Sequence, residues 1–217
     1  MLYCLIRLKY QTVEFGALDI HVRGLRDVQE FPADGAELTE PLLSSSNWAL
    51  FGVLWESSRV LAHLMCDYDI EGRRILEVGC GLGLASLVLN ARGADISATD
   101  YHPETRGFLA ANVDLNQGQP IPFAQANWLD GNCGLGTFDL IIGSDLLYER
   151  GHAELLSVFV NANAKAACEV LLVDPGRGQM GRMRSFMSKF GYGYVEHDES
   201  LGQVIPPRTQ IASYYRG

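Results

Sequence analysis

Three glycines at alternate positions, Gly79, Gly81 and Gly83, stand between a short apolar run and a helical pattern of apolar residues. Glycine tolerates positive φ and lets a ligand lie against bare backbone, and the first N–H groups of a helix have no partner within that helix. A strand, a glycine turn and a helix in this order are typical of a nucleotide-binding site. Cys80 supplies the small side chain that such a turn needs, so we expect it to be structural rather than nucleophilic.

The register of the glycines separates this turn from the Gly-x-Gly-x-x-Gly fingerprint of dinucleotide-binding folds. The sixth position counted from Gly79 is Leu84, and the sixth counted from Gly81 is Ser86, with no strand directly before Gly81. Asp100 lies 21 residues after Gly79, at the end of the next predicted strand. A carboxylate there can accept hydrogen bonds from both hydroxyls of a ribose. A nicotinamide-dependent reductase therefore fits the position of Asp100 but does not fit the glycines.

Further side chains that could do chemistry follow two other predicted strands. Trp128 can cover the face of a purine, with Asn127 or Asp130 at its amino edge, although a surface turn is the alternative interpretation of these residues. Asp145 and Tyr148 follow the next strand along the chain. Because ligands of doubly wound sheets bind outside the carboxyl ends of the strands, we expect these residues and the glycine turn to meet at one edge.

Strand and helix patterns alternate from residue 74 to residue 190, which predicts a doubly wound, mostly parallel α/β sheet. Two last strands would add an antiparallel hairpin, and the first 50 residues would form an N-terminal cap of strands and loops on the same domain. The predicted strands are 2–8, 12–15, 18–22, 74–78, 95–99, 123–126, 138–143, 169–173, 192–196 and 210–215, and a helix is predicted at 51–66. We thus expect one domain, with 1–50 as its cap segment and 51–217 as its ligand-binding part.

The composition narrows the class of protein. The chain has 217 residues, a net charge of −9 and a pI of about 5.0, whereas proteins that bind phosphate backbones usually carry basic surfaces, so nucleic acid is a poor default partner. The basic cluster of Arg177, Arg182, Arg184 and Lys189 is expected to be a solvated helix face. The five cysteines form no metal or disulfide pattern, which fits a cytoplasmic location. No transmembrane helix or signal peptide is expected.

Four motifs carry a resemblance to a known family. They are Leu54-Trp55-Glu56, the segment from Glu77 to Gly83, Asn127-Trp128, and Asp145-Leu146-Leu147-Tyr148. With them the chain resembles the class I, seven-strand S-adenosylmethionine-dependent methyltransferases over roughly residues 50–217, and more narrowly the family-16 protein methyltransferases, whose members modify lysine. Asp174-Pro175-Gly176-Arg177 is similar to the branch that methylates the electron-transfer flavoprotein β subunit. The resemblance implies a Rossmann-like, seven-stranded sheet with a C-terminal antiparallel hairpin.

The resemblance also implies a role for each matching residue. S-adenosylmethionine would be the cofactor, and the reaction would need no metal. Asp145 and Tyr148 would be catalytic, at the mouth of the acceptor pocket. Asp100 would hold the ribose, Trp128 would cover adenine, and Trp55 would close over the cofactor from the N-terminal side. The residues implied to bind the cofactor are Trp55, Glu77, Gly79, Cys80, Gly81, Gly83, Asp100, Tyr101, Asn127, Trp128, Ser144 and Asp145.

We hypothesise that Asp145 binds and orients a lysine amine and that Tyr148 offers it a π-face or a hydroxyl. The acidic net charge favours a protein substrate with a basic segment. A small-molecule amine as acceptor, and a non-catalytic module that binds the cofactor, are the two alternatives. A nucleic-acid amino-methyltransferase is less favoured, because such enzymes resemble Asn/Asp-Pro-Pro-Tyr where this chain has Asp-Leu-Leu-Tyr.

Overall fold

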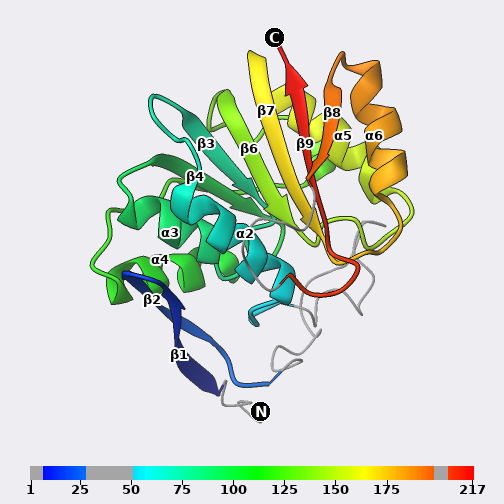
Figure 1. Ribbon diagram of the computed structural model, residues 1–217. Helices are drawn as coiled ribbons and strands as arrows, with labels where there is room; N and C mark the ends of the chain where they lie inside the picture. Colours follow the sequence, from blue (N-terminus) through cyan, green and yellow to red (C-terminus); the bar gives the residue numbers. More distant parts are fainter. Residues whose placement is uncertain (1–6, 28–50, 198–204) are drawn as a thin grey trace, which may run out of the picture.

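The computed structural model describes residues 7–27, 51–197 and 205–217. Its centre is a seven-stranded sheet in the order β5-β4-β3-β6-β7-β9-β8 (Figure 1). Strands β3 to β7 run parallel, and β9 pairs antiparallel with both β7 and β8. The predicted mostly parallel sheet with an antiparallel C-terminal hairpin is therefore confirmed. The strands are β3 (Arg74–Val78), β4 (Asp95–Asp100), β5 (Phe123–Gln125), β6 (Phe138–Ser144), β7 (Ala164–Asp174), β8 (Gly193–His197) and β9 (Gln210–Arg216).

Helices cover both faces of the sheet. One hydrophobic cluster packs the sheet against α2 (Glu56–Asp67), α3 (Leu84–Ala91) and α4 (Thr105–Leu115), and a second packs it against α5 (His152–Asn163) and α6 (Met180–Lys189) (Figure 1). Successive side chains of a strand point to opposite faces. Accordingly Leu171 and Val173 of β7 belong to the first cluster, and Val170 and Leu172 belong to the second. This two-sided burial explains why the central strands are continuous apolar runs.

An N-terminal hairpin forms a separate two-stranded sheet. Strands β1 (Leu8–Phe15) and β2 (Leu18–Leu25) pair antiparallel, and β2 packs against α3 and α4 (Figure 1). The Asn116 side chain of α4 bonds the backbone of His21, accepting from its N–H at 2.8 Å and donating to its carbonyl at 2.6 Å. The predicted strands at 12–15 and 18–22 are confirmed and are longer than predicted. Most of the predicted strand at 2–8, like the rest of the cap from 28 to 50, lies outside the described residues.

The helix predicted at 51–66 begins only at Glu56. Gly52 has φ +91°, a conformation that breaks a helix, and its carbonyl accepts a hydrogen bond from the N–H of Leu25 at 2.7 Å. Trp55 is extended and caps the helix. The contact with the hairpin therefore holds 51–55 as a turn, although the residue types allow a helix. Strand β7 is longer than predicted because its first residues continue the ladder beside β6 and β9.

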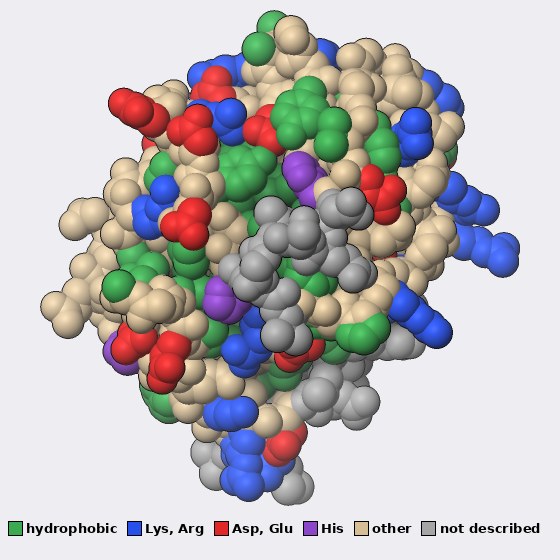
Figure 2. Space-filling model, in the orientation of Figure 1, with side chains coloured by type: hydrophobic (Ala, Val, Ile, Leu, Met, Phe, Trp, Pro, Cys, Tyr) green, Lys and Arg blue, Asp and Glu red, His purple; other side chains and the backbone are tan. Residues whose placement is uncertain are grey.

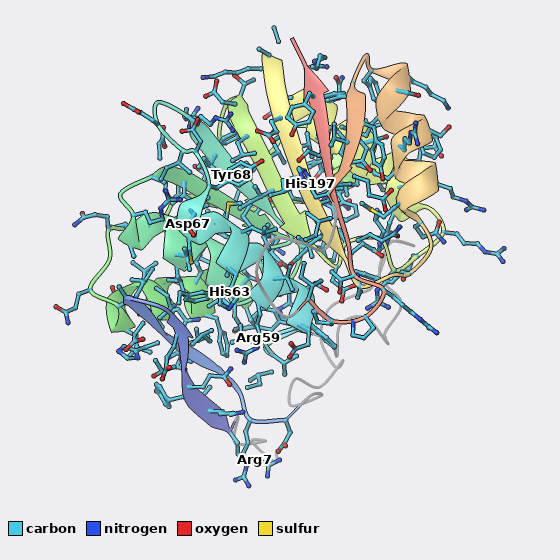
Figure 3. The ribbon with its side chains drawn as sticks, in the orientation of Figure 1. Arg7, Arg59, His63, Asp67, Tyr68 and His197 are labelled. Carbon is cyan, nitrogen blue, oxygen red and sulfur yellow. The ribbon has the colours of Figure 1, made fainter. Side chains whose placement is uncertain are left out.

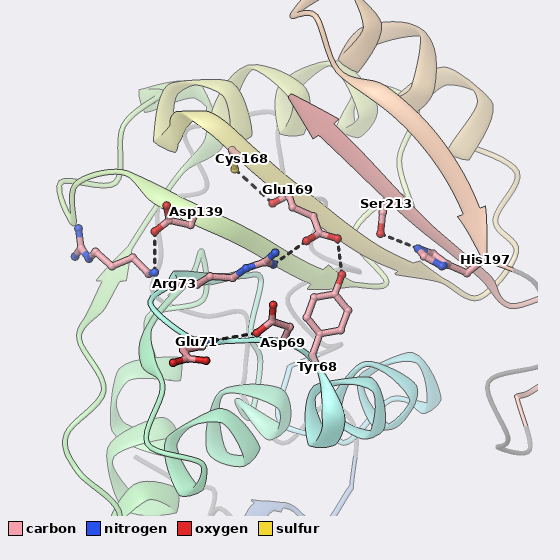
Figure 4. A network of polar contacts seen from close by, with 10 residues as sticks. Tyr68, Asp69, Glu71, Arg73, Asp139, Cys168, Glu169, His197 and Ser213 are labelled. Atoms are coloured by element: carbon pink, nitrogen blue, oxygen red, sulfur yellow. Dashed lines mark hydrogen bonds and ion pairs between the residues drawn. The ribbon is translucent and has the colours of Figure 1, made fainter. Parts of the chain in front are cut away.

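A network of polar side chains ties α2 to the amino-terminal half of the sheet (Figure 4). The carboxylate of Glu169 on β7 accepts hydrogen bonds from the Tyr68 hydroxyl at 2.5 Å and from Arg73 Nη1 at 2.7 Å. Lys165 Nζ lies 2.7 Å from a carboxylate oxygen of Asp139. Tyr68 follows the end of α2, along which Arg59, His63 and Asp67 succeed one another at intervals of four residues (Figure 3). The contact between Tyr68 and Glu169 thus joins the end of α2 to β7.

Candidate active site

A pocket opens at the carboxyl ends of β3, β4 and β6, the edge that the sequence predicts for a ligand. It is closed on one side by the start of α2. Nine of the predicted site residues line it: Trp55, Gly79, Gly81, Asp100, Tyr101, Trp128, Ser144, Asp145 and Tyr148. Residues up to 93 positions apart in the chain are thus brought to one place by the parallel strand order.

The three glycines of the turn differ in what surrounds them: two are packed against leucine side chains, and one faces the pocket. Gly79, Gly81 and Gly83 have φ of +62°, +55° and +75°. A Cβ at Gly79 would lie 2.4 Å from a methyl group of Leu146, and one at Gly83 would lie 2.5 Å from a methyl group of Leu109, so a side chain at either position would displace a buried leucine. A Cβ at Gly81 would meet no atom within 4 Å. Gly81 therefore presents bare backbone to the pocket, where a ligand can approach.

Asp100 links the glycine turn to the end of β4. One carboxylate oxygen accepts a hydrogen bond from the Gly81 N–H at 2.8 Å, and the other accepts one from the His102 N–H at 2.8 Å. Burial raises the pKa of this carboxyl group, and the hydrogen bonds from the two N–H groups act in the opposite direction. Each carboxylate oxygen has a further lone pair, so Asp100 can still accept hydrogen bonds from a diol in the pocket.

Two residues that the sequence did not single out complete this wall. The Phe51 ring stacks on the His102 imidazole with the centroids 4.1 Å apart and the planes 6° from parallel, and both residues line the pocket. Burial lowers the pKa of His102 to about 4, so the stacked imidazole is neutral at physiological pH. His102 has a sequence signal, since it follows the strand-end carboxylate Asp100. Phe51 has none, because its contact with His102 depends on how the segment before α2 packs against the hairpin and the end of β4.

Aromatic rings form the opposite wall. His152, buried at the start of α5, meets the ring of Trp128 edge-on at 5.3 Å and the ring of Tyr148 edge-on at 4.5 Å. Its Nδ1 lies 2.9 Å from the Leu146 carbonyl oxygen, which fixes the imidazole. Burial, with the nearby carboxylates, raises the pKa of Tyr148 above its ordinary value, so its hydroxyl keeps its proton. His152 supports two pocket rings without lining the pocket itself.

Four of the residues predicted to bind the cofactor lie outside the pocket lining: Glu77, Cys80, Gly83 and Asn127. Glu77 is 2% exposed, and its carboxylate accepts hydrogen bonds from the N–H and the hydroxyl of Ser86 at the start of α3. It therefore holds the helix behind the turn rather than facing a ligand. Cys80 and Gly83 are buried in the turn. The Asn127 side chain accepts a hydrogen bond from the Leu129 N–H at 3.0 Å and caps a short 3-10 turn, Trp128–Asp130, that carries Trp128.

Burial governs the ionisation of the two titratable residues beneath the glycine turn. It raises the pKa of Glu77 to about 7, against which the hydrogen bonds from Ser86 act. It also raises the pKa of the Cys80 thiol well above its ordinary value. A buried and protonated thiol is a poor nucleophile, which agrees with the structural role predicted for Cys80.

Asp145 stands at the tip of β6 in an unusual conformation. Its φ is +54°, and its N–H donates to the Val173 carbonyl of β7 at 2.9 Å. Both of its carboxylate oxygens are engaged by Arg177, with Nε 2.5 Å from Oδ1 and Nη2 3.0 Å from Oδ2. The Arg177 guanidinium carbon also lies 5.9 Å from the centre of the Tyr148 ring. The acceptor end of the pocket thus carries an ion pair, which the sequence analysis did not predict.

The position of Arg177 corrects its assignment to a solvated helix face. Arg177 precedes α6 and lines the pocket. The other three members of the basic cluster, Arg182, Arg184 and Lys189, are exposed on α6 as predicted. Figure 2 shows Lys and Arg side chains standing out at the edge of the molecule on the side of α6. The sequence could have separated Arg177 from the others, since it follows the strand-end carboxylate Asp174.

In the part of the chain that the structure describes, no group of three or more His, Cys, Asp or Glu residues is placed to hold a metal ion. Within the same residues, no helix has the length and apolar character needed to cross a membrane.

Comparisons with known proteins agree with this geometry. The model of a protein family described as lysine methyltransferase matches residues 44–189. The electron transfer flavoprotein beta subunit lysine methyltransferase of Xenopus laevis is 29% identical over 136 residues, which are 61% of this chain and 53% of that protein. Protein N-lysine methyltransferase METTL21A of Danio rerio is 34% identical over 116 residues, which are 48% of this chain and 52% of that protein. The chain thus spans about half the length of these relatives.

A solved structure supports the fold. Magnesium protoporphyrin IX methyltransferase from Synechocystis PCC 6803, determined with bound S-adenosylmethionine, superposes with a TM-score of 0.57. The two chains are 18% identical, and the match covers 74% of this chain and 78% of the other. At this identity the likeness concerns the fold alone, a Rossmann-like sheet with helices on both faces.

Proposed function

The chain belongs to the lysine methyltransferase family, and we propose that it transfers a methyl group from S-adenosylmethionine to the side-chain amine of a lysine in a protein substrate. The observation that carries this proposal is the convergence of Gly81, Asp100 and Trp128 on one pocket whose other end holds Asp145 and Tyr148. One end suits a nucleoside, and the other offers polar and aromatic groups to an amine. The relatives named above, two protein lysine methyltransferases, support the choice of acceptor.

The residues present fit the cofactor. Gly81 leaves open space where any side chain would project into the pocket, and the Asp100 carboxylate has lone pairs left for the two ribose hydroxyls. The indole of Trp128 offers an apolar face to adenine, and Trp55, which is 39% exposed, can cover the cofactor from the start of α2. When bound, S-adenosylmethionine supplies an electrophilic methyl group on a sulfonium centre.

The acceptor end must deliver a neutral amine in line with that methyl group. Holding two reactants in line contributes up to about 7–11 kcal/mol in favourable cases, so positioning is the main task of the protein here. Tyr148 offers its ring face and a protonated hydroxyl, and the Asp145 side chain lines the acceptor end of the pocket. Burial of an amine among such groups lowers its pKa and favours the neutral form that attacks.

The finer features of the substrate and its location are also part of the proposal. The net charge of −9 supports a substrate whose segment around the lysine is basic, because opposite charges steer association at long range. The four cysteines among the described residues, Cys66, Cys80, Cys133 and Cys168, are free thiols, which supports a reducing compartment such as the cytoplasm.

Labelling a lysate with methyl-labelled S-adenosylmethionine and the purified protein tests the function. We expect the label to enter protein bands and, after digestion, to be found on lysine side chains. Label in small molecules alone would show an amine metabolite as the acceptor, and label nowhere would show a binding module without this activity. Either result contradicts the proposal.

The variant Asp145→Ala tests the acceptor site. We expect at least a tenfold lower rate of methyl transfer, because the variant removes the carboxylate that lines the acceptor end of the pocket. The affinity for S-adenosylmethionine, measured by calorimetry, should be unchanged. Transfer at the wild-type rate would remove Asp145 from the site. Arg182→Ala on the exposed face of α6 is the control and should transfer at the wild-type rate.

A further inference from the structure

The acceptor end of the pocket carries a two-point ion pair between Asp145 and Arg177. Nε and Nη2 of Arg177 each meet one carboxylate oxygen, at 2.5 and 3.0 Å. Two parallel hydrogen bonds between a guanidinium and a carboxylate fix both planes and are among the strongest polar contacts in proteins. The Asp145 side chain is 13% exposed and that of Arg177 is 38% exposed, so the carboxylate is largely enclosed while the guanidinium still meets solvent. A lysine amine entering the mouth would therefore meet a paired carboxylate.

The loop between β7 and α6 holds Arg177 in place. One carboxylate oxygen of the buried Asp174 accepts hydrogen bonds from the N–H of Gly176 at 2.8 Å and of Arg177 at 2.7 Å. Gly176 has φ +91°, and a Cβ there would lie 2.6 Å from the carbonyl oxygen of Arg208. The backbone of Arg177 is thus fixed from two sides, which directs its side chain to Asp145.

Several other titratable groups surround the pair. Three of them are carboxylates: Asp100 on β4, Glu149 on the β6–α5 loop and Asp174 on β7. The other titratable side chains near the pair are those of Tyr148, His102 and His152. Among the described residues that line the pocket, Arg177 is the only Lys or Arg. Burial raises the pKa values of Asp100 and Asp174, against which hydrogen bonds from backbone N–H groups act. Burial also lowers the pKa of His102 and raises that of Tyr148, so both of these side chains are uncharged at pH 7.5.

We infer that Arg177 is a positioning residue that cancels the charge of Asp145, so that the acceptor site receives lysine as a neutral amine. The inference rests on the proposed function. An unpaired carboxylate within ~4–6 Å raises the pKa of an amine by about 1–3 units and would hold the unreactive ammonium form. With Arg177 in place, the attraction of Asp145 and the repulsion of Arg177 largely offset each other. Asp145 then keeps the acceptor end of the pocket in shape without stabilising the ammonium form of the substrate lysine.

Removing the charge of one partner or of the other should shift the pH dependence in opposite directions. In Arg177→Gln the lone Asp145 should raise the pKa of the bound amine, so the midpoint of the single-turnover rate against pH should move up by about one unit. In Asp145→Asn the lone Arg177 should move that midpoint down by about one unit. The double variant should return to the wild-type midpoint, because the mouth is again neutral. Arg177→Lys keeps the charge and should stay close to the wild type.

Binding gives a second readout that does not depend on turnover. With S-adenosylhomocysteine in the cofactor site at pH 8, the probe would be a synthetic peptide spanning the lysine that the lysate labelling identifies. Arg177→Gln should bind this peptide more tightly, by up to about tenfold, and Asp145→Asn should bind it more weakly, because one pKa unit of the bound amine corresponds to a tenfold change in the affinity for its ammonium form relative to its neutral form. A merely structural role for Arg177 would weaken binding in both variants.

The experiment measures single-turnover rates on this peptide between pH 7.5 and 10.5 with saturating S-adenosylmethionine for the wild type and the four variants. Opposite shifts that cancel in the double variant support the inference. An unchanged midpoint in Arg177→Gln, or an equal shift in Arg177→Lys, overturns it. Loss of cofactor affinity in Arg177→Gln also overturns it, since Arg177 would then belong to the cofactor site. If the wild type labels no protein lysine at all, the proposed function itself fails and the inference fails with it.

Discussion

The two ends of the central sheet use polar side chains in opposite ways. At the amino ends of the strands, polar groups are matched to each other. The Glu169 carboxylate accepts hydrogen bonds from Arg73 and Tyr68 (Figure 4). The Asp139 carboxylate accepts hydrogen bonds from Lys165 and from the Arg74 N–H. At the carboxyl ends, polar groups from separate strands face a pocket. The first arrangement stabilises the fold, and the second keeps hydrogen-bonding capacity for a ligand.

The titration of the carboxyl groups reflects the same difference. Burial raises the pKa of Glu77 beneath the pocket, and it also raises the pKa of Asp100 in the pocket wall. At the amino ends, the pKa of Asp139 is lowered: burial opposes the change, but the hydrogen bonds from Lys165 and the Arg74 N–H, with the charges of Lys165 and Arg73, together outweigh it. A raised carboxyl pKa marks a place where the charge is poorly compensated by the protein, and a lowered one marks a place where it is well compensated.

The largest effect expected from this difference is the pH dependence of stability caused by Glu77. Its pKa rises from 4.5 to about 7 on folding, so its contribution is fully present below pH 4.5 and is lost as pH rises through 7. Between pH 5 and 7.5 the wild type should lose up to roughly 3 kcal/mol of unfolding free energy that Glu77→Gln does not lose. Asp139 acts in the opposite sense, and its contribution is lost as pH falls below its ordinary pKa of 3.8.

Urea unfolding of the wild type and of Glu77→Gln across this pH range checks the prediction. Parallel curves for the two proteins would show that Glu77 is not the titrating group. The variant Asp139→Asn is the control, and it should follow the wild type between pH 5 and 7.5.

The second effect concerns the bare backbone of the glycine turn. Gly81→Ala places a methyl group in the pocket, and we expect about a 100-fold loss of affinity for S-adenosylmethionine, which corresponds to ~2.7 kcal/mol. Gly93→Ala is a matched control, because Gly93 also has positive φ and open space around its Cβ position but lies at the amino end of β4. Both variants should lose about 1 kcal/mol of stability from backbone strain. Equal cofactor affinities, measured by calorimetry, would place the cofactor elsewhere.

The third effect separates stability from binding. Glu169→Gln should lower the unfolding free energy by about 2 kcal/mol, because the buried carboxylate holds both Arg73 and Tyr68, and should leave the affinity for S-adenosylmethionine unchanged. Chemical denaturation and calorimetry on the same preparation measure the two quantities. A weaker cofactor affinity would show that the two ends of the sheet are coupled.

The smallest effect is expected at the exposed ion pair of the amino end. The Lys165 side chain is 42% exposed, so its pair with Asp139 is screened by solvent. Lys165→Met should cost about 0.5 kcal/mol. A loss above ~2 kcal/mol, measured by urea unfolding, would mean that this pair is as important as the buried contacts of Glu169.

The strand ends were predictable from the sequence, whereas the directions of several side chains were not. Asp100, Trp128 and Asp145 follow apolar runs, so the parallel topology alone brings them together. Glu77 belongs to the strand itself, and the period of two places it on the face of Ile75, toward α3. The period of two therefore indicated that Glu77 is buried, whereas the family motif favoured a Glu77 that lines the cofactor.

The pairing of Asp145 with Arg177 could not be predicted from local patterns. The two residues lie on separate loops 32 positions apart, and their contact depends on how the β7–α6 loop packs against the segment that holds Arg208. The stack of Phe51 on His102 likewise depends on how the segment before α2 packs against the N-terminal hairpin and the end of β4. Contacts between loops depend on tertiary packing, about which residue types and spacing say little.

Mass spectrometry of a lysate incubated with the protein and S-adenosylmethionine bearing a deuterated methyl group tests the central claim most directly. The account predicts deuterated methyl groups on lysine side chains of protein, much reduced with Gly81→Ala and retained with Gly93→Ala. Deuterium confined to small molecules, absent altogether, or equal with the two glycine variants would contradict it.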